Sequence, residues 1–159
     1  MTGVESADMS AVFSNGKFYN KGESGTSFGG FPPANAIDGN YQHRYGDGEV
    51  RDMATSDDKS ASLLVKWKGS GLEINRIAVW PRTDASTDRY EELSVSLNGQ
   101  NCECEESCLS EFCIDSLVKQ RKPVMFKCHS NSYRQSGTIE VSNGEDSLLQ
   151  VVEVQLMHC

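Results

Sequence analysis

The sequence lacks any long apolar run, and this absence excludes one class of protein at once. No uninterrupted apolar stretch approaches the roughly 18 residues that a membrane-spanning helix needs, so we expect no direct insertion into a membrane. Residues 1–5 also lack the basic-then-apolar pattern of a secretory signal, and we expect any such signal to lie outside this chain. No Asn-x-Ser/Thr acceptor is present, so N-glycosylation gives no support for secretion.

Basic residues are few relative to acidic ones. Lys and Arg together number 15 against 23 Asp and Glu, which gives a formal net charge of −8. Affinity for nucleic acid depends on neutralising phosphates, and docking on anionic lipid depends on clustered basic side chains. The charge therefore argues against a nucleic-acid partner and against a lipid surface.

Histidine is scarce, and no catalytic pattern surrounds it. The three histidines, His43, His129 and His158, lie in unlike sequence contexts. No Ser-His-Asp, Cys-His or metal-water pattern accompanies them. We therefore expect a binding protein and not an enzyme.

Long amphipathic helices are missing too, while short alternating segments are frequent. Residues 93–97 alternate strictly between apolar and polar and stop at the turn dipeptide 98–99, Asn-Gly. The other expected strands cover residues 62–67, 72–80, 124–126, 138–141 and 148–157. The pattern predicts an all-β fold, a jelly-roll β-sandwich of about eight antiparallel strands in a single domain, residues 1–159. Residues 14–60 are expected to form long loops at one end, with one helical turn in their second half.

The six cysteines are unevenly placed, since none precedes Cys102. An even number suits a disulfide framework in an oxidising compartment. The alternative is a zinc site made of Cys102, Cys104 and Cys108 with His129 or His158. The C-x-C and C-x3-C spacings differ from the paired C-x2-C of structural zinc sites, so they favour disulfides.

One polar motif offers oxygen ligands. Asn35, Asp38 and Asn40 fall within one tight turn that bends at Gly39. Calcium takes about six to eight oxygen ligands with flexible geometry. The same residues also suit an Asx-rich turn that holds no ion.

A second motif carries paired guanidinium groups. Arg82, Asp84 and Arg89 form an R-x-D-x4-R pattern directly after an expected strand. Two arginines present several fixed donors to adjacent hydroxyl groups of a sugar ring, and an aspartate between them holds their heads in place. The alternative is a solvated cluster of ion pairs, which contributes little to the stability of the fold.

Both motifs, and the strands around them, resemble the F-type lectins (fucolectins) and the discoidin-like domains. Residues 34–40 resemble the NAxDGN segment of that family, and residues 82–89 resemble half of its sugar-binding motif. Residues 136–141 and 148–154 resemble its last two strands. The matches occur in the family's order between residues 30 and 157.

The resemblance implies a structural calcium ion. Val152 and Glu153 fall where the family has a Cys-Glu pair, whose carbonyl and carboxylate complete the calcium site. The implied ligands are Asn35, Asp38, Asn40, Asp52, the carbonyl of Val152 and the carboxylate of Glu153.

The resemblance also implies a carbohydrate site. Arg82 and Arg89 would contact the sugar, and Asp84 would orient them. Thr55 stands where the family has a histidine that binds the sugar, and His43 in the preceding loop is the candidate substitute.

Cysteine usage both departs from the family and agrees with it. Ala85 and Ser86 stand where the family often has adjacent cysteines that pack against the sugar. The resemblance implies one retained disulfide, between Cys113 and Cys128, that links two late strands.

The function implied is that of a calcium-stabilised carbohydrate-binding (lectin) domain in recognition or adhesion, of fucose type or of altered specificity. The alternative is a discoidin-like protein–protein adhesion module that has lost sugar binding. The expected partner is a glycan or glycoprotein, and the expected location is extracellular, as a secreted protein or an ectodomain. A homo-oligomer and a place in a larger extracellular chain are both compatible with the sequence.

Overall fold

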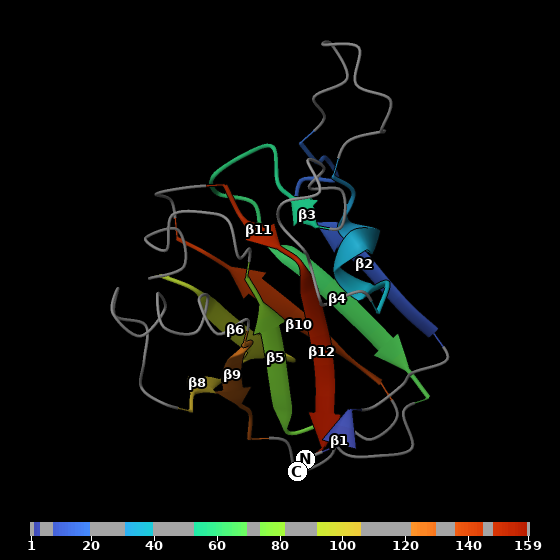
Figure 1. The fold of residues 1–159 in the computed structure, drawn as a ribbon, viewed down its shortest axis with the longest axis vertical. Coiled ribbons are helices and arrows are strands. Elements are labelled where there is room, and N and C mark those ends of the chain that lie inside the picture. Colours follow the sequence, from blue (N-terminus) through green and yellow to red (C-terminus); the bar gives the residue numbers. More distant parts are fainter. Residues whose placement is uncertain are drawn as a thin grey trace.

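The structure is a computed structural model, and it describes nine segments of the chain. These are residues 2–3, 8–19, 31–39, 53–69, 74–81, 92–105, 122–129, 136–144 and 148–158. Within them every strand pair is antiparallel, and two five-stranded sheets pack face to face beside a short helical segment (Figure 1).

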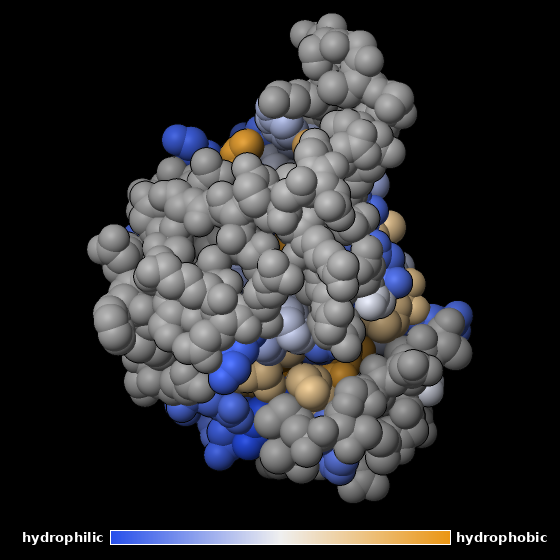
Figure 2. All heavy atoms as spheres, in the orientation of Figure 1, coloured by the Kyte–Doolittle hydropathy of each residue, from blue (hydrophilic) through white to orange (hydrophobic). Residues whose placement is uncertain are grey.

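The first sheet faces the viewer in Figure 1. Its order is β1 (Thr2–Gly3), β12 (Glu153–His158), β5 (Arg76–Trp80), β9 (Val124–Lys127) and β8 (Glu103–Cys104). Ile77 and Val79 on β5 are fully buried between the sheets, so Trp80 and Arg76 point to the outer face. Figure 2 shows apolar surface in the lower half of this outer face, with hydrophilic residues beside it.

The second sheet lies behind the first. Its order is β2 (Asp8–Phe13), β4 (Leu63–Lys68), β10 (Ser136–Ser142), β6 (Ser94–Leu97) and β7 (Gln100–Asn101). Leu63, Val65 and Trp67 on β4 are buried, while the alternate Lys66 is exposed. This period of two places one apolar face against the first sheet, where burying a Leu, Val or Ile side chain contributes about 1.5–3 kcal/mol.

A third, two-stranded sheet forms one end of the sandwich. It pairs β3 (Ala54–Thr55) with β11 (Gln150–Val151). The 3-10 helix η2 (Pro33–Ile37) packs against β3, β12 and β2. Val152 separates β11 from β12 and donates its N–H to the carbonyl of Trp80 at 2.9 Å. The end of the first sheet is thereby joined to the small sheet and to η2.

The all-β sandwich expected from the sequence is confirmed, with differences in its elements. Strand β2 lies in a segment where no strand was expected, and the expected strand 148–157 divides in two at Val152. The single helical turn expected within residues 35–60 overlaps η2, which begins at Pro33. No helix in the described segments is long and apolar enough to cross a membrane.

The expected disulfide between Cys113 and Cys128 is wrong, because Cys128 is bonded to Cys102. The pairing of Glu103 with Lys127 in β8 and β9 places Cys102 and Cys128 opposite one another one step further along the ladder. Their Cα atoms are 4.5 Å apart, which is the spacing of facing residues at a non-hydrogen-bonded position. The bond therefore joins two residues that strand pairing already brings together.

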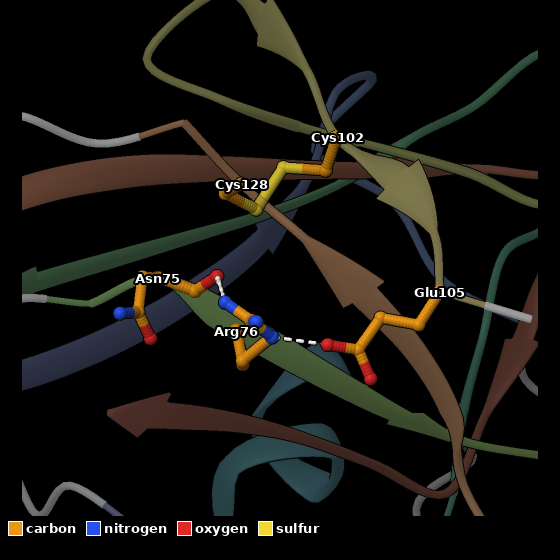
Figure 3. Close-up of a disulfide and its surroundings, with 5 residues drawn as sticks. All are labelled: Asn75, Arg76, Cys102, Glu105 and Cys128. Carbon is orange, nitrogen blue, oxygen red and sulfur yellow. Dashed lines mark hydrogen bonds and ion pairs between the residues drawn. A yellow bond between two sulfur atoms is a disulfide. The ribbon is translucent and has the colours of Figure 1, made fainter. Parts of the chain in front are cut away.

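This bond fastens the point where the chain passes from one sheet to the other. Cys102 lies between β7 of the second sheet and β8 of the first, and its N–H donates to the carbonyl of Val95 at 2.8 Å. Beside the bond, Arg76 pairs with Glu105 and donates to the carbonyl of Asn75 at 3.1 Å (Figure 3). Because Cys102 is oxidised, the alternative zinc site that used its thiolate is also wrong.

Candidate functional site

Asp38 and Glu153 meet at the end of the sandwich that carries η2 and the small sheet. Asp38 ends η2, and Glu153 begins β12 opposite Trp80. The N–H of Gly39 donates to Oε2 of Glu153 at 3.0 Å. Gly39 has a φ of 82°, which suits glycine and lets the chain turn its N–H groups toward the carboxylate.

The carboxylate of Glu153 is placed where water does not reach it. Glu153 is 4% exposed, and its buried Oε1 has no hydrogen-bond partner among the described residues. The pKa of Glu153 is raised to about 8, chiefly by burial and also by the side-chain hydrogen bond and negative charge of Asp38, against a lowering by the N–H groups of Gly39 and Asp38. A buried carboxylate with an unsatisfied oxygen is costly unless it is protonated or paired with a cation.

The donor set fits calcium. Hard carboxylate, carboxamide and carbonyl oxygens are the ligands that this ion prefers. Asn35 lies in the same helical turn as Asp38, and its Nδ2 donates to the carbonyl of Met53 at 3.2 Å. Since no cluster of three His, Cys, Asp or Glu occurs in the described segments, an ion here would draw on neutral oxygens beside Asp38 and Glu153.

The structure thus brings together some of the residues expected to hold calcium. Asp38 and Glu153 are in contact, and Val152, which is fully buried, precedes Glu153. The remaining expected residues of both sites, Asn40, His43, Asp52, Arg82, Asp84 and Arg89, lie outside the described segments, as does Cys113. Described β5 and Pro81 lead directly to Arg82, so the arginine motif follows the strand that pairs with Glu153.

Thr55 occupies an enclosed position. It is 2% exposed, and its buried Oγ1 has no hydrogen-bond partner in the part of the chain that the structure describes. Tyr19, Phe31 and Thr55 form a closed ring of backbone hydrogen bonds, in which each N–H donates to the next carbonyl. The distances are 2.8 Å from Tyr19 to Thr55, 3.1 Å from Thr55 to Phe31 and 3.0 Å from Phe31 to Tyr19. The role of Thr55 in ligand binding stays a prediction.

A small apolar cluster beside this ring did not follow from the sequence. We call it the end cluster: Phe31, Met53 and Val152 are buried, and Tyr19 and Trp80 are partly exposed against them. Its members come from five separate segments, so no periodicity links them. The only local signal is Trp80, which stands two residues before Arg82.

No protein-family model matches the chain, and no curated protein matches its sequence. Solved structures do share its fold. A family 32 carbohydrate-binding module from a family 31 glycoside hydrolase of Clostridium perfringens has a TM-score of 0.58 at 12% identity, over 98% of this chain and 97% of that one. A second C. perfringens family 32 module, in complex with galactose, has a TM-score of 0.52 at 16% identity, over 98% and 97%.

A third similar structure is a fucose-binding module of Streptococcus pneumoniae. It has a TM-score of 0.50 at 17% identity and covers 98% of this chain and 94% of that one. All three neighbours are discoidin-like β-sandwiches. At these identities the likeness shows the fold alone, and it confirms the expected discoidin-like β-sandwich fold.

Proposed function

We propose that this chain is a calcium-stabilised carbohydrate-binding module that recognises a glycan and performs no catalysis. The observation that carries the proposal is the buried carboxylate of Glu153, which faces Asp38 at the end of a sandwich shared with sugar-binding modules. The neighbours are described as bound to galactose or as fucose-binding. One of them is a module of a glycoside hydrolase, so a sugar-binding part beside a catalytic part is one setting for this fold.

Calcium would link η2 to β12. Asp38 and Glu153 would supply charged oxygens, with Asn35 and the carbonyl of Val152 as neutral ligands. The cation would remove the repulsion between the two carboxylates and would bind Oε1 of Glu153, which has no hydrogen-bond partner within the described segments. The ion supplies structural stability at the end of the sandwich where the ligand-binding loops start.

The sugar site would lie at the same end. Arg82, Asp84 and Arg89 follow β5, whose last residue, Trp80, pairs with Glu153. Guanidinium groups that bind adjacent hydroxyl groups need a fixed scaffold, because ordering two long side chains costs about 2 kcal/mol each in rotamer entropy. A cation that fixes the start of β12 would hold that scaffold.

A glycan array in calcium and in excess chelator tests the proposal. The expected result is binding of galactose- or fucose-containing glycans in calcium, with weaker binding after chelation. Arg82→Ala should remove binding in both conditions and leave the calcium-dependent stability unchanged. Failure of every glycan at every calcium level contradicts the proposed function.

A protein-binding role is the second candidate. The observation in its favour is the burial of Thr55, which stands at the position of the family's sugar-binding histidine. A discoidin-like scaffold without that contact would serve adhesion to a protein partner. Under this candidate the glycan array stays blank while calcium still stabilises the protein.

An extracellular location is part of the proposal. The bond between Cys102 and Cys128 is of a kind that persists in oxidising compartments and is rare in the cytosol.

A further inference from the structure

Strand β2 ends the second sheet, and it is regular along its whole length. It pairs with β4 without interruption from Asp8, opposite Lys68, to Phe13, opposite Leu63. Figure 1 shows β2 beside β4 at the border of the sheet, with η2 in front of it on the side of the first sheet. No strand of the described segments other than β4 pairs with β2, so one long side of β2 is a sheet edge.

The hydrogen bonds show which backbone groups lie on this edge. The N–H of Ser14 donates to the carbonyl of Ser62 at 2.8 Å, so the residue after β2 lies in a hydrogen-bonded pair with the segment before β4. Hydrogen-bonded and non-hydrogen-bonded pairs alternate along antiparallel strands. The N–H and C=O groups of Met9 and Ala11 therefore point away from β4. No hydrogen bond between described residues uses these groups.

The edge lacks the features that keep strands from pairing edge to edge. Native edge strands are protected by lysine, by proline or by a bulge. Strand β2 has the sequence Asp-Met-Ser-Ala-Val-Phe, which contains neither lysine nor proline, and its register with β4 has no bulge. Val12, on the outer face of the strand, is 50% exposed and is the one large apolar side chain that is exposed in the described segments. The edge of β2 is therefore suited to accept a further strand.

We propose that β2 pairs with β2 of a second copy of this chain, which joins the second sheets of the two copies into one continuous sheet. A two-fold axis beside Ser10 makes the new pair antiparallel, as every strand pair in this sheet is. Met9 of each copy then lies opposite Ala11 of the other. Each such pair exchanges both of its N–H···O=C bonds, so the free backbone groups of both residues are satisfied.

The turn after β2 favours this register over the next one. A shift by two residues would place Met9 opposite Phe13 of the second copy. The carbonyl of Phe13 already accepts the N–H of Gly16 at 2.9 Å. The register centred on Ser10 uses only backbone groups that have no other partner among the described residues.

The side chains on the outer face suit the same arrangement. Ser10, which is small and exposed, meets Ser10 of the second copy. Asp8 of one copy lies opposite Val12 of the other, so the two Asp8 carboxylates stand at opposite ends of the new strand pair. A parallel pairing in register would set these carboxylates side by side, and like charges directly opposite one another are destabilising. The charge of the strand therefore selects the antiparallel dimer.

The size of the edge indicates a reversible dimer. A strand of six residues offers a small contact compared with the roughly 1,600 Å² that a standard interface buries. Under the proposed function, such a dimer carries two ligand sites on one particle. Two linked sites that reach ligands on the same surface raise the overall avidity by about 10²–10⁴.

Sedimentation of the full chain without glycan tests the assembly. From micromolar to millimolar protein, the average mass should rise from 17.5 kDa toward twice that value. Ser10→Lys places two like charges opposite one another across the axis and should keep the protein monomeric over this range. Asn101→Lys adds the same charge to β7, the opposite edge of the same sheet, and should dimerise like the original protein.

A cross-link tests the register. Facing residues at a non-hydrogen-bonded position have Cα atoms about 4.5 Å apart, which is within the range that a disulfide spans. Cys102 and Cys128 are bonded at this same spacing of 4.5 Å. Ser10→Cys should therefore give a disulfide-linked dimer on a non-reducing gel after mild oxidation. Ser136→Cys, which places an exposed thiol on β10 of the same sheet, should stay monomeric.

Two results would overturn the proposal. A mass of 17.5 kDa at every concentration would leave the edge of β2 to a strand of another protein. Self-association that Ser10→Lys does not weaken, together with no cross-link in Ser10→Cys, would show that the copies meet at another surface. Neither measurement contains a glycan, so either failure leaves the proposed function untouched.

Discussion

The N–H of Gly39 donates to Oε2 of Glu153 at 3.0 Å, although 114 residues separate the two in the chain. This contact joins the end of η2 to the first residue of β12 and buries a carboxylate beside Asp38. Asp38 and Glu153 each bring a carboxyl group to this contact. The free-energy cost of joining the two segments therefore depends on how the two negative charges are neutralised.

Replacing Glu153 by Gln separates the effect of charge from that of shape. Glu153→Gln removes the repulsion with Asp38 and keeps an acceptor for the N–H of Gly39. A cation at a free concentration 100-fold above its Kd adds about 2.7 kcal/mol to the original protein, a rise of about 5–10 °C in Tm for a domain of this size. We expect calcium to raise the Tm of the original protein and to leave that of Glu153→Gln unchanged in thermal unfolding. An equal rise in both proteins contradicts the placement of the ion.

The pKa of Glu153 gives the cation-free protein a pH dependence. The folded-state pKa of Glu153 is about 8 against an ordinary pKa of 4.5 for a glutamate, so between these values the folded state binds more protons than the unfolded state. The free energy of unfolding therefore falls as pH rises through this window. The full stabilising contribution of Glu153 is present below about pH 4.5. Calcium, which binds the deprotonated carboxylate, should oppose this fall.

Urea unfolding in chelator across this window measures the effect. The difference in unfolding free energy between the original protein and Glu153→Gln isolates Glu153 from the other titrating groups. A difference that stays constant from pH 4.5 to pH 8 would show that Glu153 titrates normally in the folded state.

The disulfide can be tested by removing Cys102, the partner of Cys128. Cys102→Ser opens a loop with a sequence separation of 26 and should cost about 3–4 kcal/mol in unfolding free energy. Cys104→Ser serves as the matched control, because Cys104 is a free thiol two residues away. Peptide mapping without reduction should yield a fragment that joins Cys102 to Cys128. A fragment that joins Cys113 to Cys128 would restore the pairing implied by the family resemblance.

The contact between Gly137 and Trp67 predicts a sensitive position in the second sheet. A Cβ at residue 137 would lie 2.1 Å from the Trp67 ring, closer than atoms approach without displacement. Gly137→Ala should therefore cost about 1–3 kcal/mol through overpacking. The neighbouring Ser136 is exposed, and Ser136→Ala should change the unfolding free energy little. Similar values for the two variants in chemical denaturation would mean that the ring moves aside without strain.

Several strands were predictable because one face of each is buried. The alternation in β6 and in β10 leaves Val95, Leu97, Ile139 and Val141 closed to solvent, which is the condition under which a period of two appears in a sequence. Strand β2 carries the same alternation, with Phe13 buried and Asp8 exposed, but one of its inward positions is Ala11, a residue type depleted in strands.

The remaining features depend on contacts between distant segments. β3 and β11 have two residues each, too few for any periodicity, and they exist because Thr55 and Gln150 pair. The partner of Cys128 follows from the register of β8 with β9, which cysteine spacing does not contain. Of the candidate calcium ligands, the sequence placed Asp38 and Glu153 in one site only through the family resemblance, since they are far apart in the chain.

A crystal structure of the protein grown in calcium and soaked with galactose tests the central claim most directly. We predict a cation bonded to Asp38 and Glu153 and a galactose ring at the same end of the sandwich. A structure with neither ion nor sugar at that end, at millimolar calcium and saturating galactose, would contradict the claim.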